Sequence, residues 1–171
     1  IAKLSPDEHG LTILPFISGE RSPGWAGNAT ASFSGMDLQT TPAAIFRGLL
    51  EGIGVRLALI ADQVRSVATA ADHAVASGGA VDDMPAWLQI IADLAGLPIV
   101  HSREGQATLR GTALTALAVV APNVERSPPD LGERSEPTPA HARTYAATRE
   151  RNLLAYRRLV QADAAARLAS P

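Results

Sequence analysis

Residues 73–87 read HAVASGGAVDDMPAW, which is a short apolar strand followed by paired glycines and the first turn of a helix. Gly78 and Gly79 come directly after the strand, and because glycine has no side chain, a ligand can approach the backbone closely there. The helix is expected to begin at residues 83–85, with its free amides and the positive end of its dipole directed at the same gap. The unit therefore suits a nucleotide or another anion. A plain tight turn between a strand and a helix is the alternative.

Strands and helices alternate on both sides of this unit. An apolar run at residues 11–18 predicts a buried strand, and residues 29–36 can form a second short strand. Helices are expected at residues 41–64, 85–94 and 108–120. One further strand is expected at residues 98–101. Such alternation predicts an α/β fold with a parallel or mixed sheet flanked by helices.

The first long helix has a clear start signal, with Thr41 as N-cap and Pro42 at the first helical position. Apolar residues at spacings of three and four form its expected buried face, namely Ile45, Leu49, Ile53, Leu57, Ile60 and Val64. Glycines 48, 52 and 54 lie inside the helix and each costs about 1 kcal/mol relative to alanine, so close packing against a neighbour is expected there. Arg47 and Glu51 stand four residues apart and are expected to form a solvated pair.

Composition divides the chain into three parts. Residues 1–121 form the expected domain, and residues 122–139 are rich in Pro, Ser, Glu and Arg, which is typical of a surface loop. Residues 140–171 are expected to form a long C-terminal helix, ending near Leu168, that packs on the same domain. Its apolar side chains are Tyr145, Leu153, Leu154, Leu159 and Val160.

The bulk composition excludes several classes of protein. Hydrophobic residues make up 46% and charged residues 19% of the chain, as in ordinary globular domains, and a net charge of −2 gives no strong attraction to nucleic acid or an anionic membrane. Absence of cysteine excludes disulfides, thiolate catalysis and cysteine–zinc sites. No apolar run is long enough to span a bilayer, and residues 1–6 lack the apolar core expected of a signal peptide. A cytoplasmic location is expected, and Ile1 is expected to be an internal position of a longer protein.

Other groups of polar residues carry weaker signals. The loop at residues 19–25 combines Glu20, Arg21 and Trp25 with rigid Pro and Gly, which makes a plausible binding edge. The alternative is structural, with Glu20 and Arg21 paired to neighbours and Trp25 capping the core. Asp82 and Asp83 are interpreted as helix caps rather than as an acid–base pair. The four histidines have no metal-ligand spacing, so no metal site is predicted.

Four segments in this order resemble the C-terminal domain of the FGGY carbohydrate kinases. They are LPFISGERSPGW at residues 14–25, FRGLLEGI at 46–53, ASGG at 76–79 followed by WLQIIADLAGLP at 87–98, and RGTA at 110–113. The resemblance implies a ribonuclease H-like fold of the actin/hexokinase type. In this fold two such domains enclose the sugar and ATP, which is bound with Mg²⁺. It also implies that the adenosine of ATP lies against Gly78, Gly79, Ala80, Asp83 and Met84.

The sequence departs from the family pattern at several places. The spacing from Gly79 to Trp87 is one residue longer than usual, and Met84 stands where a Ser or Asn usually caps the helix. Thr30 replaces a usual arginine, and Ser77 replaces a third glycine found in several members. The departures at Met84 and Thr30 are the basis for an alternative in which the chain is a non-catalytic module that binds a nucleotide or a partner. A purely structural domain is a further alternative, whereas a dehydrogenase is excluded because no Gly-x-Gly-x-x-Gly follows a strand.

The resemblance also implies what the chain lacks. The catalytic aspartate and the phosphate-binding loops of the family would precede Ile1, so the chain is expected to be inactive alone and to pair with the N-terminal domain of the same protein. An exposed apolar surface is expected where that domain packs, and a homodimer is one alternative for the isolated chain. The motif around Trp25 and the two-glycine ASGG favour D-gluconate, phosphorylated on a primary hydroxyl to 6-phosphogluconate. Xylulose and other sugars or polyols are the alternatives.

Overall fold

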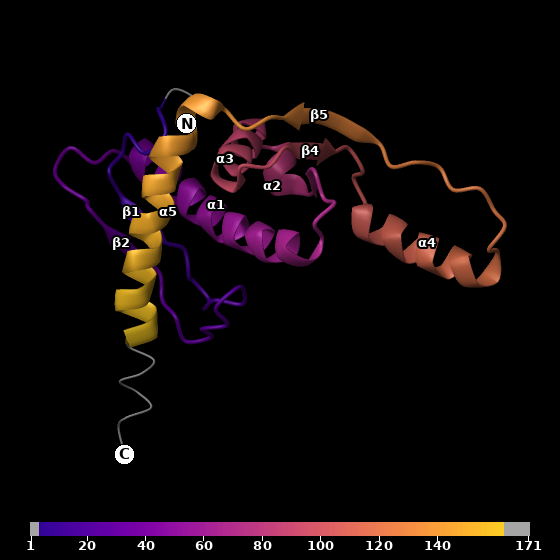
Figure 1. Cartoon of the computed structure of the whole chain (residues 1–171), viewed down its shortest axis with the longest axis horizontal. Coiled ribbons are helices and arrows are strands. Elements are labelled where there is room, and N and C mark those ends of the chain that lie inside the picture. The colour runs from indigo at the N-terminus through magenta and orange to yellow at the C-terminus, as the bar shows by residue number, and fades with distance from the viewer. Residues whose placement is uncertain (1–3, 163–171) are drawn as a thin grey trace, which may run out of the picture.

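The protein forms short strands and longer helices in a mixed arrangement, shown in Figure 1. The computed structural model describes residues 4–162. The elements in chain order are β1 (Thr12–Leu14), β2 (Ser32–Ser34), α1 (Pro42–Val67), β3 (Ala74–Ala76), α2 (Gly79–Asp82), α3 (Pro85–Ala95), β4 (Ile99–Ser102), α4 (Ala107–Val120), β5 (Leu131–Ser135), the 3₁₀ turn η1 (Pro139–His141), α5 (Ala142–Tyr156) and the π-helical turn η2 (Arg157–Gln161). None of the helices in this part of the chain is long and apolar enough to cross a membrane.

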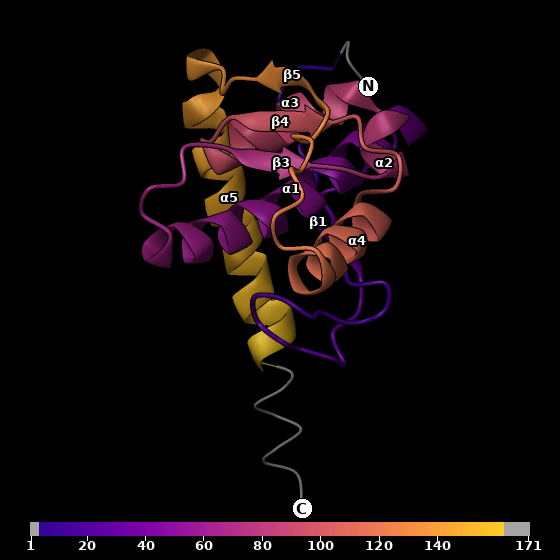
Figure 2. The same cartoon turned by 90° about the vertical axis from the view of Figure 1, so that its right-hand side faces the viewer.

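Two small sheets organise the domain. β1 and β2 pair antiparallel, and a mixed sheet has the order β3-β4-β5, with β3 parallel and β5 antiparallel to β4. α3 packs on β4, α1 packs on α3, and α5 crosses α1 and lies beside β1, as Figures 1 and 2 show. This confirms the predicted α/β fold with a mixed sheet between helices and a long C-terminal helix.

α1 begins as predicted and uses its glycines for close packing. The Ala44 amide donates to Thr41 Oγ1 at 3.2 Å, and Pro42 is the first helical residue. A Cβ added at Gly52 would lie 2.6 Å from the Ile13 carbonyl oxygen, and one at Gly54 would lie 2.5 Å from Leu94 Cδ1. The backbone of β1 and a side chain of α3 therefore occupy space that any larger residue would need.

The buried face of α1 differs from the predicted one. The face turned to the interior contains the three glycines together with Arg47, Leu50, Glu51, Val55, Arg56 and Ala58. On the predicted face, Leu57 is 37% and Val64 is 50% exposed. The prediction was wrong because apolar periodicity does not register glycines, and glycines are what allow β1 and α3 to approach this helix closely.

The Arg47–Glu51 pair is buried rather than solvated, with exposures of 5% and 1%. Glu51 Oε1 accepts from Arg47 Nε at 2.6 Å and from the Tyr145 hydroxyl at 3.1 Å, and Glu51 Oε2 lies 3.0 Å from His9 Nε2. Burial raises the pKa of the Glu51 carboxyl, but hydrogen bonds from His9 and Arg47 outweigh it and hold this pKa below its ordinary value. Glu51 is thus an ionised interior group that joins the N-terminal segment, α1 and α5.

The buried face of the C-terminal helix was predicted only in part, since Tyr145 and Val160 are buried as expected. Its interior residues are Tyr145, Thr148, Asn152, Tyr156 and Val160. Of the predicted apolar residues, Leu154 and Leu159 are exposed, and Leu168 lies outside the described residues. Asn152 Nδ2 donates to the Ile13 carbonyl oxygen at 3.0 Å, so α5 meets the backbone of β1 through a polar side chain.

Residues 122–139 were predicted to form a surface loop. They contain β5, which pairs antiparallel with β4.

We predict that Glu51→Gln lowers the free energy of unfolding by about 3 kcal/mol, because it leaves buried Arg47 without its charged partner. The folded-state pKa of Glu51 lies below the ordinary 4.5. Its contribution is therefore complete above that value and is lost as the pH falls through the folded-state pKa. Urea unfolding at neutral pH and near pH 3 should show a difference from wild type that shrinks in acid. Glu125→Gln, at an exposed position, should change nothing, and an equal effect of both variants would contradict the role of Glu51.

Candidate functional site

The paired glycines lie at an open end of β3. Gly78 has φ 109° and ψ 157°, a conformation that L-residues with a side chain rarely adopt, and it precedes the four-residue helix α2. A Cβ added at Gly78 or Gly79 would meet no atom within 4 Å. Backbone conformation therefore requires glycine at position 78. At position 79, neither the backbone conformation nor the packing of the chain requires a glycine.

The other predicted nucleotide-binding residues surround this turn. Ala80 and Asp83 are exposed, and Met84 is half-buried with its side chain against the main core cluster. Asp83 closes α2 at its C-terminal end, where its amide donates to the Gly79 carbonyl oxygen at 2.9 Å. Met84 precedes α3 without a capping hydrogen bond from its side chain. The structure thus brings four of the five residues together on an open surface.

The two aspartates do not have the predicted capping role. The expected helix start at residues 83–85 is preceded by α2, so Asp83 lies at a helix end instead of a helix start. Asp82 Oδ1 lies 2.7 Å from His101 Nε2 at the end of β4. This contact, which joins residues 19 positions apart, ties α2 and the glycine turn to the sheet. Sequence spacing contains no signal for it.

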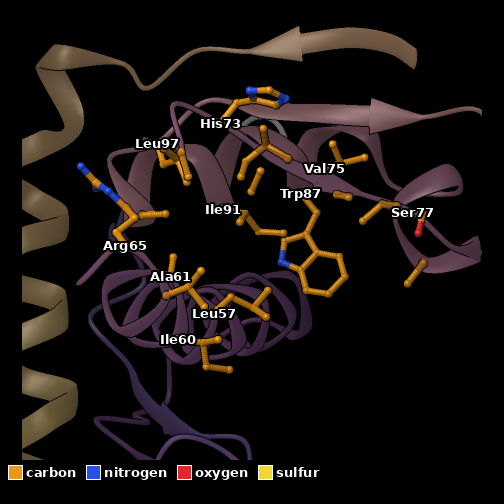
Figure 3. Close-up of a pocket in the computed structure, with 18 residues that line it drawn as sticks. Leu57, Ile60, Ala61, Arg65, His73, Val75, Ser77, Trp87, Ile91 and Leu97 are labelled. Carbon is orange, nitrogen blue, oxygen red and sulfur yellow. The ribbon is translucent and has the colours of Figure 1, made fainter. Parts of the chain in front are cut away.

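An apolar groove adjoins the glycine turn, with a volume of ≈ 630 Å³. Figure 3 shows the groove between α1 and the β3–α3 layer, with the Trp87 ring and the Leu57 side chain facing each other. Ile60 also lines the groove. The Trp87 indole donates to the Leu50 carbonyl oxygen at 3.3 Å, which fixes the ring. Ser77 and Ala80 belong to both the groove and the glycine turn. The sequence-based prediction missed this groove because it assigned the side chains of α1 that line it to the core.

The loop at residues 19–25 is built around Glu20, which is only 4% exposed. Glu20 Oε1 accepts from the Arg56 guanidinium and Oε2 accepts from the Tyr156 hydroxyl at 2.5 Å. Burial, followed by the hydrogen bond to Glu20, raises the pKa of Tyr156 to about 12. The structural alternative for this loop is therefore confirmed for Glu20, which pairs with Arg56 in the interior. It is wrong for Trp25, which is 76% exposed instead of capping the core.

Arg56 is the residue of this cluster that the sequence did not single out. Its guanidinium carbon lies 5.3 Å from the ring centre of Phe16 and 4.7 Å from that of Tyr156, which are cation–π distances. Its Nε and Nη1 atoms have no hydrogen-bond acceptor among the described residues. The Phe16 and Tyr156 rings, instead of hydrogen-bond acceptors, lie next to this guanidinium. With Glu20 inside, Arg21 and Trp25 are the exposed members of the predicted binding edge.

One cluster of side chains has the spacing of metal ligands. Ligand atoms of Asp7, His9 and Glu51 all lie within 4.8 Å of one another. However, both carboxylates already have cationic partners. Arg151 binds both oxygens of Asp7, with Nη1 at 2.9 Å from Oδ2, and Arg47 binds Glu51. Two guanidinium groups neutralise the two carboxylates, so the cluster is a set of ion pairs and is unfavourable for a divalent cation.

The fold is that of a ribonuclease H-like ATPase domain of the actin/hexokinase type. Solved structures with this fold include a xylulose kinase from Brucella ovis and a gluconate kinase from Lactobacillus acidophilus. Their TM-scores are 0.76 and 0.73, their sequence identities 26% and 23%, and each match covers at least 91% of this chain. The matches cover 34% and 32% of the two solved chains.

The protein belongs to the FGGY family of carbohydrate kinases, and residues 2–120 match the C-terminal domain of that family. Similar proteins include the xylulose kinase of Escherichia coli, 33% identical over 154 residues, and the glycerol kinase of Methylibium petroleiphilum, 30% identical over 122 residues. These alignments cover 87% and 68% of this chain but only 31% and 24% of the relatives. The members of this family are phosphotransferases that act on sugars or polyols. The chain corresponds to one part of the length of such enzymes.

We predict that alanine substitution at Gly78 and at Gly79 has different effects on the free energy of unfolding. Gly78→Ala should lower the free energy of unfolding by about 1–3 kcal/mol, because φ 109° is strained for alanine. Gly79→Ala should change it by less than about 0.5 kcal/mol, because its Cβ enters open space. Urea unfolding of both variants beside wild type tests this. A large loss of stability in Gly79→Ala would mean that this glycine serves the fold.

Proposed function

We propose that the chain forms the adenosine side of the ATP site in a cytoplasmic, ATP-dependent sugar kinase. The observation that carries this proposal is Gly79, a glycine that the fold does not require, at the exposed end of a parallel strand. Its open space admits the face of a nucleoside, with the backbone of Gly78 and Ala80 beside it. Asp83 lies at the rim of the same surface. The Met84 side chain packs against the core cluster beside it. ATP would bind together with Mg²⁺, which the phosphates of ATP would hold.

The loop at residues 19–25 supplies the second edge of the proposed cleft. The buried contacts of Glu20 with Arg56 and Tyr156 hold this loop rigidly. Trp25 is held with φ 57° and its side chain is 76% exposed. A large aromatic side chain in a strained, exposed position favours a binding role. Arg21, exposed beside it, would attract the carboxylate of a sugar acid.

We propose D-gluconate as the substrate, phosphorylated on its primary hydroxyl to 6-phosphogluconate. The motifs GERSPGW and ASGG and the exposed Arg21 support this choice. Xylulose is the second candidate, because the Escherichia coli xylulose kinase aligns with most of this chain at 33% identity. The test is a coupled ADP-release assay on the full-length gene product with gluconate, xylulose, glycerol and no sugar in parallel.

We expect ADP release that depends on gluconate. Dependence on xylulose or glycerol would retain the kinase and replace the substrate. Folded protein that is silent with every sugar would favour a non-catalytic nucleotide-binding module. The 171-residue chain alone is expected to give no sugar-dependent signal, because the catalytic aspartate and the phosphate loops are proposed to lie in the N-terminal domain, in the part of the relatives that the chain does not cover. Phosphoryl transfer depends on those groups for positioning and charge stabilisation.

We predict that Gly79→Val in the full-length enzyme raises the Michaelis constant for ATP by about tenfold or more, because the valine side chain fills the space proposed for adenosine. The Michaelis constant for the sugar should stay within about twofold. Gly105→Val is the matched control, since this glycine is also exposed and a Cβ there meets nothing within 4 Å. An unchanged Michaelis constant for ATP in Gly79→Val would contradict the assignment of the site.

A further inference from the structure

The contact between His101 and Asp82 joins the end of the glycine turn to the sheet. His101 is the parallel register partner of Ala76, the last residue of β3, and its Nε2 atom lies 2.7 Å from Asp82 Oδ1 in α2. The chain leaves β3 after Ala76 and returns to the same histidine at Asp82. His101 therefore holds both ends of the segment 77–81, which contains the paired glycines. It holds one end through strand pairing and the other through its side chain.

α2 has few other means of keeping its orientation. It has four residues, and no side chain caps its N-terminal end. An isolated helix shorter than about 12 residues is marginal in water. Val81 is buried in an apolar cluster that also contains Ile91 and Ile99. Apolar packing is non-directional, so it fixes where α2 lies rather than how the turn is oriented. The hydrogen bond between His101 and Asp82 is directional and supplies the orientation.

The pairing of β4 is irregular at His101. Val100 pairs with Arg134 and Ser102 with Leu131, so two residues of β5 lie opposite His101 alone. A β-bulge of this kind increases the local twist of the strands and can re-aim a side chain. The bulge thus lies at the strand position whose side chain reaches across the end of β3 to α2.

The contact can form with a neutral or a protonated imidazole. In both states a proton on Nε2 can be donated to the carboxylate of Asp82. The two side chains are 22% and 47% exposed, so water competes with the contact and its strength is moderate. Its loss should therefore loosen the glycine turn and leave the rest of the fold intact.

We propose that His101 is a positioning residue for the nucleotide, because through Asp82 it holds the glycine turn in the orientation that receives adenosine. This inference rests on the proposed function and adds a residue to that same site. His101 acts through Asp82 and does not itself need to touch ATP. A turn that is already ordered loses less conformational entropy when a ligand binds. Loss of the contact should weaken binding of ATP and leave binding of the sugar unchanged.

Amide hydrogen exchange of the full-length gene product, without nucleotide, tests whether the contact orders the turn. The amides of Val81 and Asp82 donate to the Gly78 carbonyl oxygen at 3.0 and 3.2 Å. In His101→Leu both amides should exchange about fivefold faster, while the Ala74 amide at the start of β3 should be unchanged. His101→Gln should exchange like wild type, because its side-chain amide can replace Nε2 as the donor. Equal exchange in wild type and His101→Leu would overturn the proposal.

Binding of ATP to the same protein, measured by equilibrium dialysis, tests the positioning role. His101→Leu should raise the dissociation constant for ATP about fivefold, leave the Michaelis constant for the sugar within about twofold, and His101→Gln should restore ATP binding. His73→Leu is the matched control, since it removes the contact of His73 with Asp72, which lies before β3. Normal ATP binding in His101→Leu would overturn this role alone. Wild-type protein that binds no ATP would overturn the proposed function as well.

A double variant tests whether the two residues act together. Asp82→Ala should raise the dissociation constant for ATP by the same factor as His101→Leu, and the double variant should raise it no further. Asp82→Ala leaves β4 unaltered, so it also tests the proposal if His101→Leu destabilises the sheet. Effects that multiply in the double variant would show that the two residues act independently, which would overturn the proposal.

Discussion

The carboxylate of Glu51 is buried at 1% exposure and binds groups from three separate parts of the chain. Arg47 comes from the same helix, His9 from the N-terminal segment and Tyr145 from α5. A buried carboxylate without partners costs several kcal/mol, so these segments must converge whenever α1 is in place. Their convergence sets β1 and α5 against α1. It also brings Tyr156, near the end of α5, to Glu20 and Arg56.

The second polar cluster depends on the first. Because α5 is anchored by Tyr145, its later turns lie beside β1, where Tyr156 closes over Glu20. The loop at residues 19–25 thereby gains a rigid base, and its outer residues, Arg21 and Trp25, are left facing solvent. In the proposed function, these two exposed residues belong to one edge of the cleft. The two ends of the proposed site, the loop and the glycine turn, are thus held by different interactions.

The orientation of α1 separates the core from the surfaces that remain open. Since its polar and glycine-rich side faces inward, Leu57, Ile60 and Val64 are left to line a groove beside β3. The same helix therefore stabilises the domain on one side and presents an apolar surface on the other. The groove beside β3 and the apolar residues of α4 are exposed in the described part of the chain.

Local chemistry was determined by the sequence alone. Thr41 and Pro42 start α1, Gly96 ends α3 in the left-handed conformation, and the motifs around Trp25 and Gly79 identify the family. These features depend on residues close together in the chain. Only the tertiary structure decided which face of α1 is buried, that Glu51 is ionised inside the protein, and that a strand lies in the Pro-rich segment. The reason is physical: the partners of Glu51 lie up to 94 residues away. Helical periodicity counts apolar side chains, but it does not register that a glycine lets a distant carbonyl approach or that a distant cation makes burial of a carboxylate favourable.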